Sequence, residues 1–498
     1  MKVLVTGGTG VVGPEAVRRL VRRGHGVRLF SRHASRDRKT FGSEVEAFDG
    51  DLGDEGSLRG AADGCEAVLH LAGIVAEKPP ELTFERVNVE GTRHLVAEAE
   101  RAKVRRFVYV SSLGADRGNS DYHRSKRRAE ALVRAFSREW LVCRPGNVFG
   151  PGDGQISLLL KMVRTLPAVP LLGSGDDRFQ PVWCEDLGEA LAIAVERADL
   201  SGRELELAGD EMTSMNDLLD RFEAMTDRKP VRVALPAWLE STGAKLAAKF
   251  GLETPVNADQ IAMVTEGNVI EAGRPNALVE VLGVRPTPLA ESLPKLGDSL
   301  PEQLPSEGIG PMHRKVYRAL IRGARDGAEG LLAIVRDSFA ELAPSSTVEV
   351  GAEPASPETK LEPGATVTMA LPLRGHVQVR VEEVSPRAIT LATLEGHPLA
   401  GAVRFVAEPA GEGALRFEVQ TCYRAATLAD LVMMETLGGA LQSYTWTSFV
   451  EALVERSGGR AEGGVEIVRD DPDEGERASF ERWLEGLIRR RLKVERAA

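Results

Sequence analysis

Three glycines at intervals of three residues follow the first apolar run of the chain, and they constrain its fold more than any other feature. Gly7, Gly10 and Gly13 lie between the apolar residues 3–5 and a helical period that begins at Pro14. At a strand-to-helix turn, the first glycine permits the tight bend, the second lets backbone N–H groups approach a pyrophosphate, and the third lets the helix pack on the strand. The helix N-terminus adds positive potential for phosphates. The turn therefore predicts a bound dinucleotide, held by Gly7, Thr9, Gly10, Val11, Val12 and Gly13.

Short apolar runs alternate with helical periods after this turn. Residues 27–30, 67–71 and 107–110 are largely apolar, whereas residues 14–23 and 88–102 have helical periodicity. Strands that are buried on both faces of a parallel sheet have this pattern, because helices connect and cover them. The alternation predicts an α/β fold with a doubly wound, Rossmann-type parallel sheet. We place this domain, with a less regular substrate-side subdomain, in residues 1–296.

The end of the second predicted strand indicates which nucleotide is bound. An NAD-selective site carries an acid there, which binds the ribose hydroxyls. Ser31 and Arg32 stand at this position instead, with Arg36 nearby. A hydroxyl and a guanidinium bind a 2′-phosphate through charge-assisted hydrogen bonds. We therefore expect NADP(H) as the preferred cofactor, with NAD(H) as the alternative.

Charge and composition exclude several classes of protein. The 498 residues include 63 Lys and Arg against 74 Asp and Glu, and the net charge of −11 disfavours binding to nucleic acid. The four cysteines are far apart, and His376 and His397 lack metal-ligand spacing, so we expect reduced thiols and no metal site. No run approaches the roughly 18 apolar residues of a membrane span, and no secretory pattern is present. We expect a cytoplasmic protein that acts on a small molecule.

Further motifs stand in the order typical of one superfamily. The sequence reads D-G-D-L at 49–52, L-A-G at 71–73 and R-P-G-N-V-F-G at 144–150. With the glycine-rich turn, they resemble extended and atypical short-chain dehydrogenases/reductases. The short gap between Ser112 and Tyr122 and the stretches at 178–182 and 282–289 are similar to a subgroup related to the nucleotide-binding accessory subunit of respiratory complex I. The resemblance implies that the cofactor also contacts Asp51, Leu52, Leu71, Ala72, Gly73, Tyr122, Lys126 and Pro145.

The same resemblance implies a redox site made of four side chains. Hydride transfer to or from a carbinol carbon needs a group that exchanges the hydroxyl proton, and an unperturbed tyrosine does this poorly at neutral pH. Lys126 follows Tyr122 by one helical turn, so its ammonium is expected to favour the phenolate. Ser112 is expected to hydrogen-bond the substrate oxygen, with Ser111 as the competing choice. Asn88 is expected to hold a water that links Lys126 to solvent.

The sequence pattern predicts fewer roles for the residues on the substrate side. Helical stretches are expected at 215–225 and 236–250. By the same resemblance, Arg178 and Gln180 face the substrate cleft, whereas Asp186 is expected to cap the helix that follows it.

A second domain is expected after a stretch rich in Pro, Gly and Ser, the predicted linker 297–311. Residues 313–342 have a helical pattern, and six strand candidates follow between residues 347 and 420. With the long helical stretch after residue 428, they resemble a helix-grip, START-like α+β domain over residues 312–458. The Met residues of that helix suit either a lipophilic pocket or an ordinary core. Residues 459–498 are expected to form a charged tail with a solvated basic helix.

Three functions are compatible with these features. The first is an NAD(P)-dependent oxidoreductase that acts on a small or lipophilic alcohol or ketone. The second is a non-catalytic nucleotide-binding assembly or sensor protein, like the complex I accessory subunit. The third is a sugar-nucleotide epimerase or dehydratase. The combination of Ser112, Tyr122 and Lys126 favours the first, because a purely structural nucleotide has no need of it.

Overall fold

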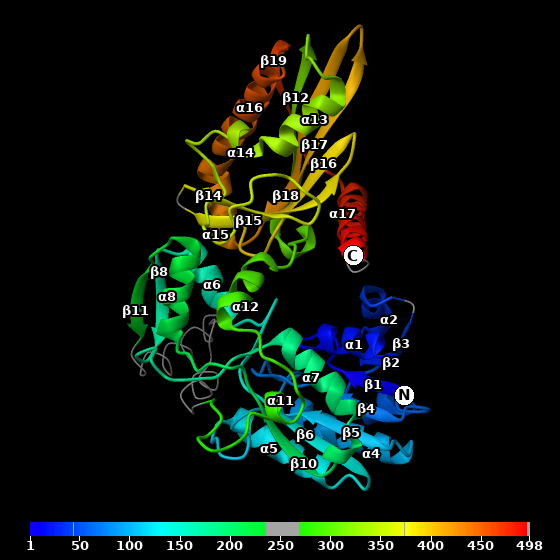
Figure 1. The fold of residues 1–498 in the computed structure, drawn as a ribbon. Helices are drawn as coiled ribbons and strands as arrows, with labels where there is room; N and C mark the ends of the chain where they lie inside the picture. Colours follow the sequence, from blue (N-terminus) through cyan, green and yellow to red (C-terminus); the bar gives the residue numbers. More distant parts are fainter. Residues whose placement is uncertain (43, 236–267, 373, 496–498) are drawn as a thin grey trace. The chain divides into compact units, whose positions relative to one another are not determined.

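The computed structural model describes residues 1–42, 44–235, 268–372 and 374–495. The chain divides into two compact units, each with its own buried core (Figure 1). Unit 1 contains Met1–Leu159, Pro170–Asp220 and Arg232–Leu296. Unit 2 contains Leu160–Val169, Arg221–Val231 and Gly297–Ala498.

Unit 1 is built on a parallel sheet. Among the described residues, the sheet has seven strands in the order β10-β6-β5-β4-β1-β2-β3, and every neighbouring pair is parallel. The strand order reverses between β1 and β4, where folds of this type bind nucleotides. The predicted doubly wound α/β fold is confirmed. The strands are β1 (Lys2–Thr6), β2 (Gly26–Ser31), β3 (Val45–Asp49), β4 (Ala67–His70), β5 (Arg106–Val110), β6 (Glu139–Pro145) and β10 (Arg203–Leu207).

Helices cover both faces of this sheet. Successive strand residues point to opposite faces, so Val3 and Val5 join one core cluster and Leu4 joins the other. The first cluster packs under α1 and α7, and the second packs under α4 and α5. These helices are α1 (Gly13–Arg22), α4 (Gly91–Arg101), α5 (Asp121–Arg134) and α7 (Cys184–Glu196).

Shorter elements complete the first 298 residues. The helical stretch predicted at 215–225 is α8, and the one predicted at 236–250 lies outside the described residues. These elements are α2 (Ala34–Asp37), η1 (Arg38–Thr40), α3 (Glu55–Leu58), the π-helical η2 (Glu85–Glu90), β7 (Val148–Phe149), α6 (Ile156–Thr165), β8 (Ala168–Leu172), β9 (Val182–Trp183), η3 (Ala198–Leu200), α8 (Met215–Thr226), β11 (Val231–Leu235), α11 (Ala277–Glu280) and α12 (Leu289–Asp298).

Unit 2 is built on an antiparallel sheet. In the described part of the chain it has eight strands in the order β13-β14-β15-β16-β17-β18-β12-β19. The six strands predicted from the sequence are β13 to β18, and the two at one edge, β12 and β19, were not predicted. The strands are β12 (Ile309–Arg322), β13 (Glu349–Val350), β14 (Thr366–Leu371), β15 (Gly375–Val384), β16 (Ala388–Thr393), β17 (Leu399–Gly411), β18 (Ala414–Ala425) and β19 (Arg460–Asp470).

Helices pack on this sheet through a separate apolar core. Val335, Phe339 and Phe449 from three helices meet Tyr317 and Phe405 from the sheet. A curved antiparallel sheet that packs on a long C-terminal helix is the α+β arrangement expected of a helix-grip domain. The helical elements are η4 (Pro305–Glu307), α13 (Gly327–Asp337), α14 (Phe339–Leu342), α15 (Leu428–Met433), the π-helical η5 (Met434–Gly438), α16 (Gly439–Arg456) and α17 (Glu474–Glu495).

The helical interpretation of residues 313–342 is wrong over its first half, which is strand β12. Tyr317, Ala319 and Ile321 are buried and the residues between them are partly exposed, a period of two that belongs to a strand. The strand hydrogen-bonds β18 and β19, which are distant in sequence. Only α13 and α14 are helical there.

The stretches on either side of this domain are also more ordered than their composition indicated. The predicted linker includes η4 and the start of β12, and the predicted tail contributes β19 to the sheet. The basic cluster at 489–493 is not wholly solvated, because Arg491 is buried. Its Nε donates to Glu382 at 2.9 Å and its Nη2 donates to Glu302 at 2.6 Å. Glu382 of strand β15 and Glu302 of the segment before η4 therefore hold helix α17 in place.

Candidate active site

The glycine-rich turn has the backbone geometry that its sequence predicts. Gly7 has φ of +72°, a region that favours glycine, and its carbonyl accepts from the Gly10 N–H at 3.1 Å. A Cβ at Gly7 would lie 2.5 Å from the Ala72 nitrogen, and a Cβ at Gly13 would lie 2.3 Å from the Gly7 oxygen. A Cβ at Gly10 would meet only the Gly7 oxygen, at 3.5 Å. Two glycines are thus required by packing, whereas Gly10 faces open space.

Helix α1 begins at this open space without a side-chain cap. Val12 is its N-cap residue and makes no capping hydrogen bond, and Gly13 and Pro14 follow. Thr9 and Gly10 are exposed, and Val11 and Val12 are half-buried. The first N–H groups of a helix need acceptors, and an anion supplies them. The turn therefore has the free donors and the room that a pyrophosphate requires.

The end of strand β2 carries a cation, Arg32, and a hydroxyl, Ser31. Arg32 is exposed and has no ion pair among the described residues. The Ser31 hydroxyl donates to Asp37 Oδ2 at 3.2 Å, and Asp37 also accepts from Arg36 Nε at 3.0 Å. No sequence pattern predicted a role for Asp37, which follows Ser31 by six residues and accepts a hydrogen bond from it. Arg32 is thus more available to an anion than Ser31 or Arg36.

The predicted adenosine side follows the end of strand β3. Asp51 is partly exposed, and its Oδ1 accepts from the Gly53 N–H at 2.8 Å, while Arg86 Nη2 lies 3.7 Å from its Oδ2. The Leu52 carbonyl accepts from His94 Nδ1 at 2.9 Å. Hydrogen bonds therefore hold the backbone at Leu52 and Gly53. Among the described residues, Asp51 Oδ2 accepts no hydrogen bond.

The segment after strand β4 connects the turn to the predicted redox site. The Leu71 N–H donates to the Thr6 carbonyl at 3.1 Å, which holds this segment against the turn. The backbone of Ala72 packs on Gly7, and a Cβ at Gly73 would lie 3.0 Å from Lys126 Nζ.

Tyr122 and Lys126 are both buried on helix α5, with 6% and 4% of their surfaces exposed. Ser120 caps this helix by accepting from the His123 N–H at 3.2 Å, which fixes where the first turn begins. Lys126 Nζ lies 6.0 Å from the centre of the Tyr122 ring and donates to the Val110 carbonyl at 3.0 Å. The one-turn spacing therefore brings the ammonium and the phenol together.

Ser112 also reaches this group despite the short gap in sequence. Its side chain is hydrogen-bonded to that of Tyr122, and it donates to the Leu113 carbonyl at 3.3 Å. The Ser111 hydroxyl is buried and has no hydrogen-bond partner in the described structure. Ser112, not Ser111, is thus the serine beside Tyr122.

Burial dominates the protonation of the two ionisable groups. It raises the pKa of Tyr122 to about 12, against a smaller lowering by the Ser112 hydrogen bond. It lowers the pKa of Lys126 to about 8, against a smaller raising by the Glu130 carboxylate. The expectation that Lys126 lowers the pKa of Tyr122 is not met: burial of the phenol raises this pKa, and Ser112 is the group that lowers it.

Asn88 is more fully occupied than the sequence indicated. Its Oδ1 accepts from the Ile74 N–H at 2.8 Å, and its Nδ2 donates to the Ile74 carbonyl at 3.1 Å and to Ser125 Oγ at 3.0 Å. Only one lone pair of Oδ1 remains for the predicted water. Asn88 lies in the π-helical turn η2, a feature that occurs often at functional sites.

A buried ion pair behind the site was not predicted. Arg144 donates from Nε and Nη2 to the two carboxylate oxygens of Glu130, at 2.8 and 2.7 Å. Glu130 follows Lys126 by four residues and shares its helix face, a spacing that would have drawn attention to it. The pair fixes strand β6, and the Pro145 carbonyl at its end accepts from the Leu113 N–H at 2.7 Å. Arg144 is thus a structural partner of helix α5.

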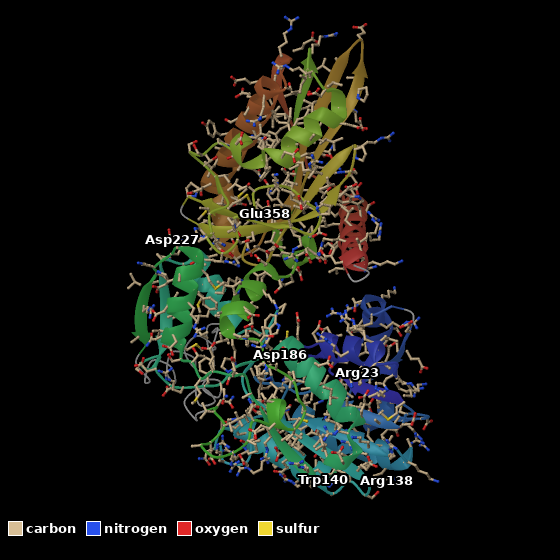
Figure 2. The ribbon with its side chains drawn as sticks, viewed as in Figure 1. Arg23, Arg138, Trp140, Asp186, Asp227 and Glu358 are labelled. Carbon is tan, nitrogen blue, oxygen red and sulfur yellow. The ribbon has the colours of Figure 1, made fainter. Side chains whose placement is uncertain are left out.

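The predicted substrate-side residues have other partners. Arg178 is exposed and pairs with Asp217 at 2.6 Å. Gln180 donates to the Gly209 carbonyl at 2.7 Å. Asp186, labelled in Figure 2, does not cap helix α7 but accepts from the Thr287 N–H at 2.7 Å and its hydroxyl at 2.9 Å. Asp186 therefore fastens the 282–289 stretch to the helix.

These features define a class of protein: unit 1 is a dinucleotide-binding α/β unit with the side chains of a short-chain-dehydrogenase site. Residues 3–208 match the model of the NAD dependent epimerase/dehydratase family, and residues 342–452 match a domain of unknown function, DUF1990. The chain belongs to the NAD dependent epimerase/dehydratase family through its first unit. A nicotinamide cofactor follows from this membership.

Individual relatives support the same family. The chain is 33% identical over 235 residues to the ceramide reductase of Caulobacter vibrioides, covering 47% of this chain and 73% of the relative. It is 31% identical over 258 residues to sterol demethylase protein B of Methylococcus capsulatus, covering 47% and 78%. It is 29% identical over 241 residues to the mitochondrial NADH dehydrogenase (ubiquinone) 1 alpha subcomplex subunit 9 of Mus musculus, covering 48% and 63%. The predicted relationship to a complex I subunit is confirmed.

The described residues include no candidate for a membrane-spanning helix or a metal site. No helix there combines the length and the apolar character needed to cross a bilayer. Within the same residues, no three His, Cys, Asp or Glu side chains are grouped as ligands for a metal ion.

Proposed function

We propose that unit 1 catalyses NAD(P)-dependent interconversion of an alcohol and a ketone. One observation carries the proposal: the Ser112 hydroxyl, the Tyr122 phenol and the Lys126 ammonium meet in one buried group beside the glycine-rich turn. A nucleotide that only stabilises the fold needs phosphate donors but no proton donor. The three side chains supply what hydride chemistry requires beyond the cofactor.

The turn and the strand ends are the proposed cofactor site. The backbone from Gly7 to Gly13 and the uncapped start of helix α1 hold the pyrophosphate, and Asp51 takes the adenine side. Arg32 pairs with a 2′-phosphate, which favours NADP(H) over NAD(H). When bound, the nicotinamide supplies or accepts the hydride.

The protonation states at neutral pH suit proton donation to a carbonyl oxygen. With a pKa of about 12, the Tyr122 hydroxyl keeps its proton and can donate it to a carbonyl oxygen that Ser112 positions. With a pKa of about 8, Lys126 is mostly charged and stabilises the phenolate that remains. Asn88 acts as a positioning residue, because it holds Ile74 and Ser125 beside this group.

An apolar substrate fits the surroundings of Tyr122. Phe84 packs edge-on against the Tyr122 ring at 5.9 Å, and Ile74 packs against both. Two relatives are named for lipid chemistry, a ceramide reductase and a sterol demethylase protein. A lipophilic ketone is therefore the proposed substrate class.

The test follows NADPH absorbance with a panel of small, aromatic, steroidal and long-chain ketones. Wild type should oxidise NADPH with an apolar ketone, and Tyr122→Phe should lose at least about a hundredfold in kcat. Tyr444→Phe is the matched control, because Tyr444 is exposed on helix α16. Equal rates in wild type and Tyr122→Phe would reject the mechanism.

The second candidate is a nucleotide-binding assembly protein, favoured by the similarity to the Mus musculus complex I subunit. It predicts NADPH binding with no turnover of any ketone in the panel. Turnover of a sugar nucleotide without net NADPH oxidation would instead support an epimerase or dehydratase, the reaction classes named for the family.

A further inference from the structure

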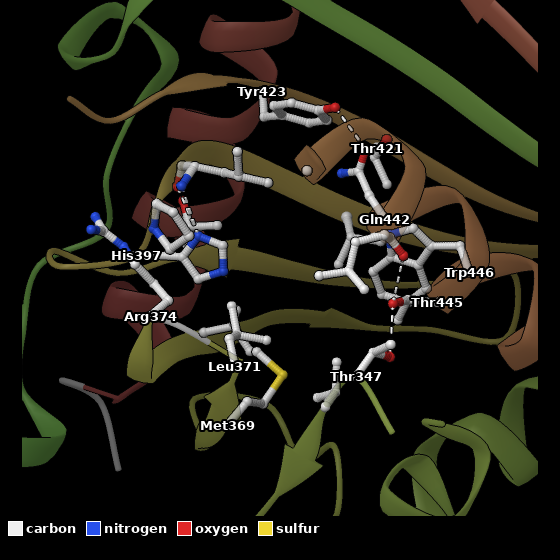
Figure 3. A pocket seen from close by; sticks show the side chains of 18 of the residues that line it. Thr347, Met369, Leu371, Arg374, His397, Thr421, Tyr423, Gln442, Thr445 and Trp446 are labelled. Carbon is white, nitrogen blue, oxygen red and sulfur yellow. Dashed lines mark hydrogen bonds between the residues drawn. The ribbon is translucent and has the colours of Figure 1, made fainter. Parts of the chain in front are cut away.

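Unit 2 contains an apolar cavity between its sheet and its C-terminal helices (Figure 3). The cavity has a volume of about 200 Å³, larger than the roughly 150 Å³ that accommodates benzene in an engineered protein core. Its wall is mainly aliphatic and aromatic, with contributions from Met369, Leu371, Leu391, Val403, Trp446 and Phe449. The space is thus suited to a ring or a short hydrocarbon chain.

A polar group stands at the end of the cavity next to strand β18. Gln442 Oε1 accepts from the Tyr423 hydroxyl at 2.7 Å and from Lys315 Nζ at 3.0 Å. Tyr423 and Met434 line this cavity and also a polar depression of about 360 Å³ that Lys315 lines. An apolar space and a charged space therefore share a wall.

Lys315 is a charge on the inner face of the sheet. Along β12 it alternates with the half-buried Arg314 and Val316 and shares its face with the buried Tyr317 and Ala319, and only 9% of its surface is exposed. The antiparallel register places it directly opposite Arg469 of β19, so two cations face each other. Like charges in this position destabilise a sheet.

No carboxylate offsets these two cations in the residues that the structure describes. Of the acids that line the depression, Asp470 pairs with Arg314, and Asp471 lies 3.6 Å from His313. The third, Glu435, is exposed and forms no ion pair with either cation. Burial, with a smaller effect of Arg469, lowers the pKa of Lys315. A buried ammonium without a counter-ion is costly unless a ligand supplies one.

The other charged groups in the wall of the cavity are electrically balanced. Arg374 Nη2 lies 2.6 Å from Asp430 Oδ1, and Asp430 is fully buried. Burial lowers the pKa of His397 to about 4, which keeps this histidine neutral. Lys315 is thus a buried cation beside this cavity that pairs with no carboxylate among the described residues.

We propose that unit 2 binds an amphipathic carboxylate, with its hydrocarbon part in the apolar cavity and its carboxylate against Lys315 and Arg469. Met434 lies at the junction of the two spaces. Binding of the carboxylate in unit 2 requires no turnover in unit 1. Its absence would therefore leave the proposed redox function untouched, and the reverse also holds.

Calorimetric titration of the full-length protein with octanoate and with octan-1-ol tests the proposal. Octanoate should bind at least about tenfold more tightly than the alcohol, since a charge-assisted contact is worth about that factor. Lys315→Met should remove this preference and leave octanol binding unchanged. Lys360→Met, which changes an exposed lysine of the same unit, should keep the preference.

Two further measurements keep the test decisive if Lys315→Met does not fold. High salt should weaken wild-type binding of octanoate but not of octanol. Met434→Trp, which fills the junction, should weaken octanoate binding. Equal affinity of wild type for both probes, no binding of either, or a salt-independent preference for octanoate would overturn the proposal.

Discussion

Two buried lysines, one in each unit, stand beside a tyrosine and differ in how the chain brings the pair together. Lys126 follows Tyr122 by one turn of helix α5, and its ammonium donates to the backbone of Val110. Lys315 and Tyr423 come from different strands and meet only through Gln442 of helix α16. The first pair is local and has the form of a proton-transfer group. The second pair is assembled by the sheet and lies at the end of an apolar cavity.

Removing the charge of each lysine separately tests whether the two sites have separate functions. Lys126→Met should lower kcat/KM for ketone reduction by at least about a hundredfold, because the phenolate loses its stabilising charge. Lys315→Met should leave this rate unchanged, since Lys315 belongs to a binding site in the other unit. Steady-state kinetics of both variants give the measurement. A similar loss in both would show that the two sites do not have separate functions.

The buried and surface ion pairs of the two units should differ in their effect on stability. Glu130→Gln should destabilise unit 1 by about 2 kcal/mol, because the buried Arg144 loses its bidentate partner while Glu204 and Asp116 still pair with it. Glu485→Gln removes a surface pair with Arg489 in unit 2 and should cost less than about 1 kcal/mol. Hydrogen exchange of strand β6 and of helix α17 under mild denaturant reports the two free energies of unfolding. Equal changes would contradict the structural role given to the Glu130–Arg144 pair.

The pH dependence of ketone reduction tests whether the charge of Lys126 is required. Its pKa of about 8 means that the ammonium loses its charge as pH rises through this value, while Tyr122 keeps its proton up to about pH 12. We expect kcat/KM to fall by about tenfold per pH unit above pH 8. Lys126→Arg keeps the charge and should remove the fall. A flat wild-type profile over this range would mean that the ammonium is not required.

Nucleotide preference gives the smallest expected effect. Arg32→Ala should weaken NADPH binding by about tenfold through loss of a charge-assisted contact to the 2′-phosphate, and NADH binding should not change. Arg36→Ala is the matched control, because Arg36 is already engaged by Asp37. Fluorescence titration with both nucleotides measures the difference. Equal loss for NADPH and NADH would remove the role proposed for Arg32.

The same contrast explains how much of the molecule was predictable. Strands β1, β2, β4 and β5, the glycine-rich turn and the one-turn spacing of Tyr122 and Lys126 depend on local patterns, and the structure has them at the predicted residues. Strand β12 was misread as helix because its order comes from pairing with β18 and β19, whose residues lie far along the chain. Lys315 was therefore overlooked.

Partners that meet only in three dimensions account for the other differences. The Glu130–Arg144 pair, the hold of Asp186 on Thr287 and the occupied amide of Asn88 all join separate elements. Residue types alone did not indicate these contacts. Desolvation of Tyr122 likewise depends on the packing of Phe84 and neighbouring elements, which a sequence pattern does not report.

Titration of the full-length protein with NADPH tests the central claim most directly, namely that the turn after strand β1 holds a pyridine nucleotide by its phosphates. Wild type should bind one NADPH per chain. Gly10→Leu should keep the fold, because its side chain enters open space, but should abolish binding by filling the place of the pyrophosphate. Absence of NADPH binding in wild type, or undiminished binding in Gly10→Leu, would contradict the account.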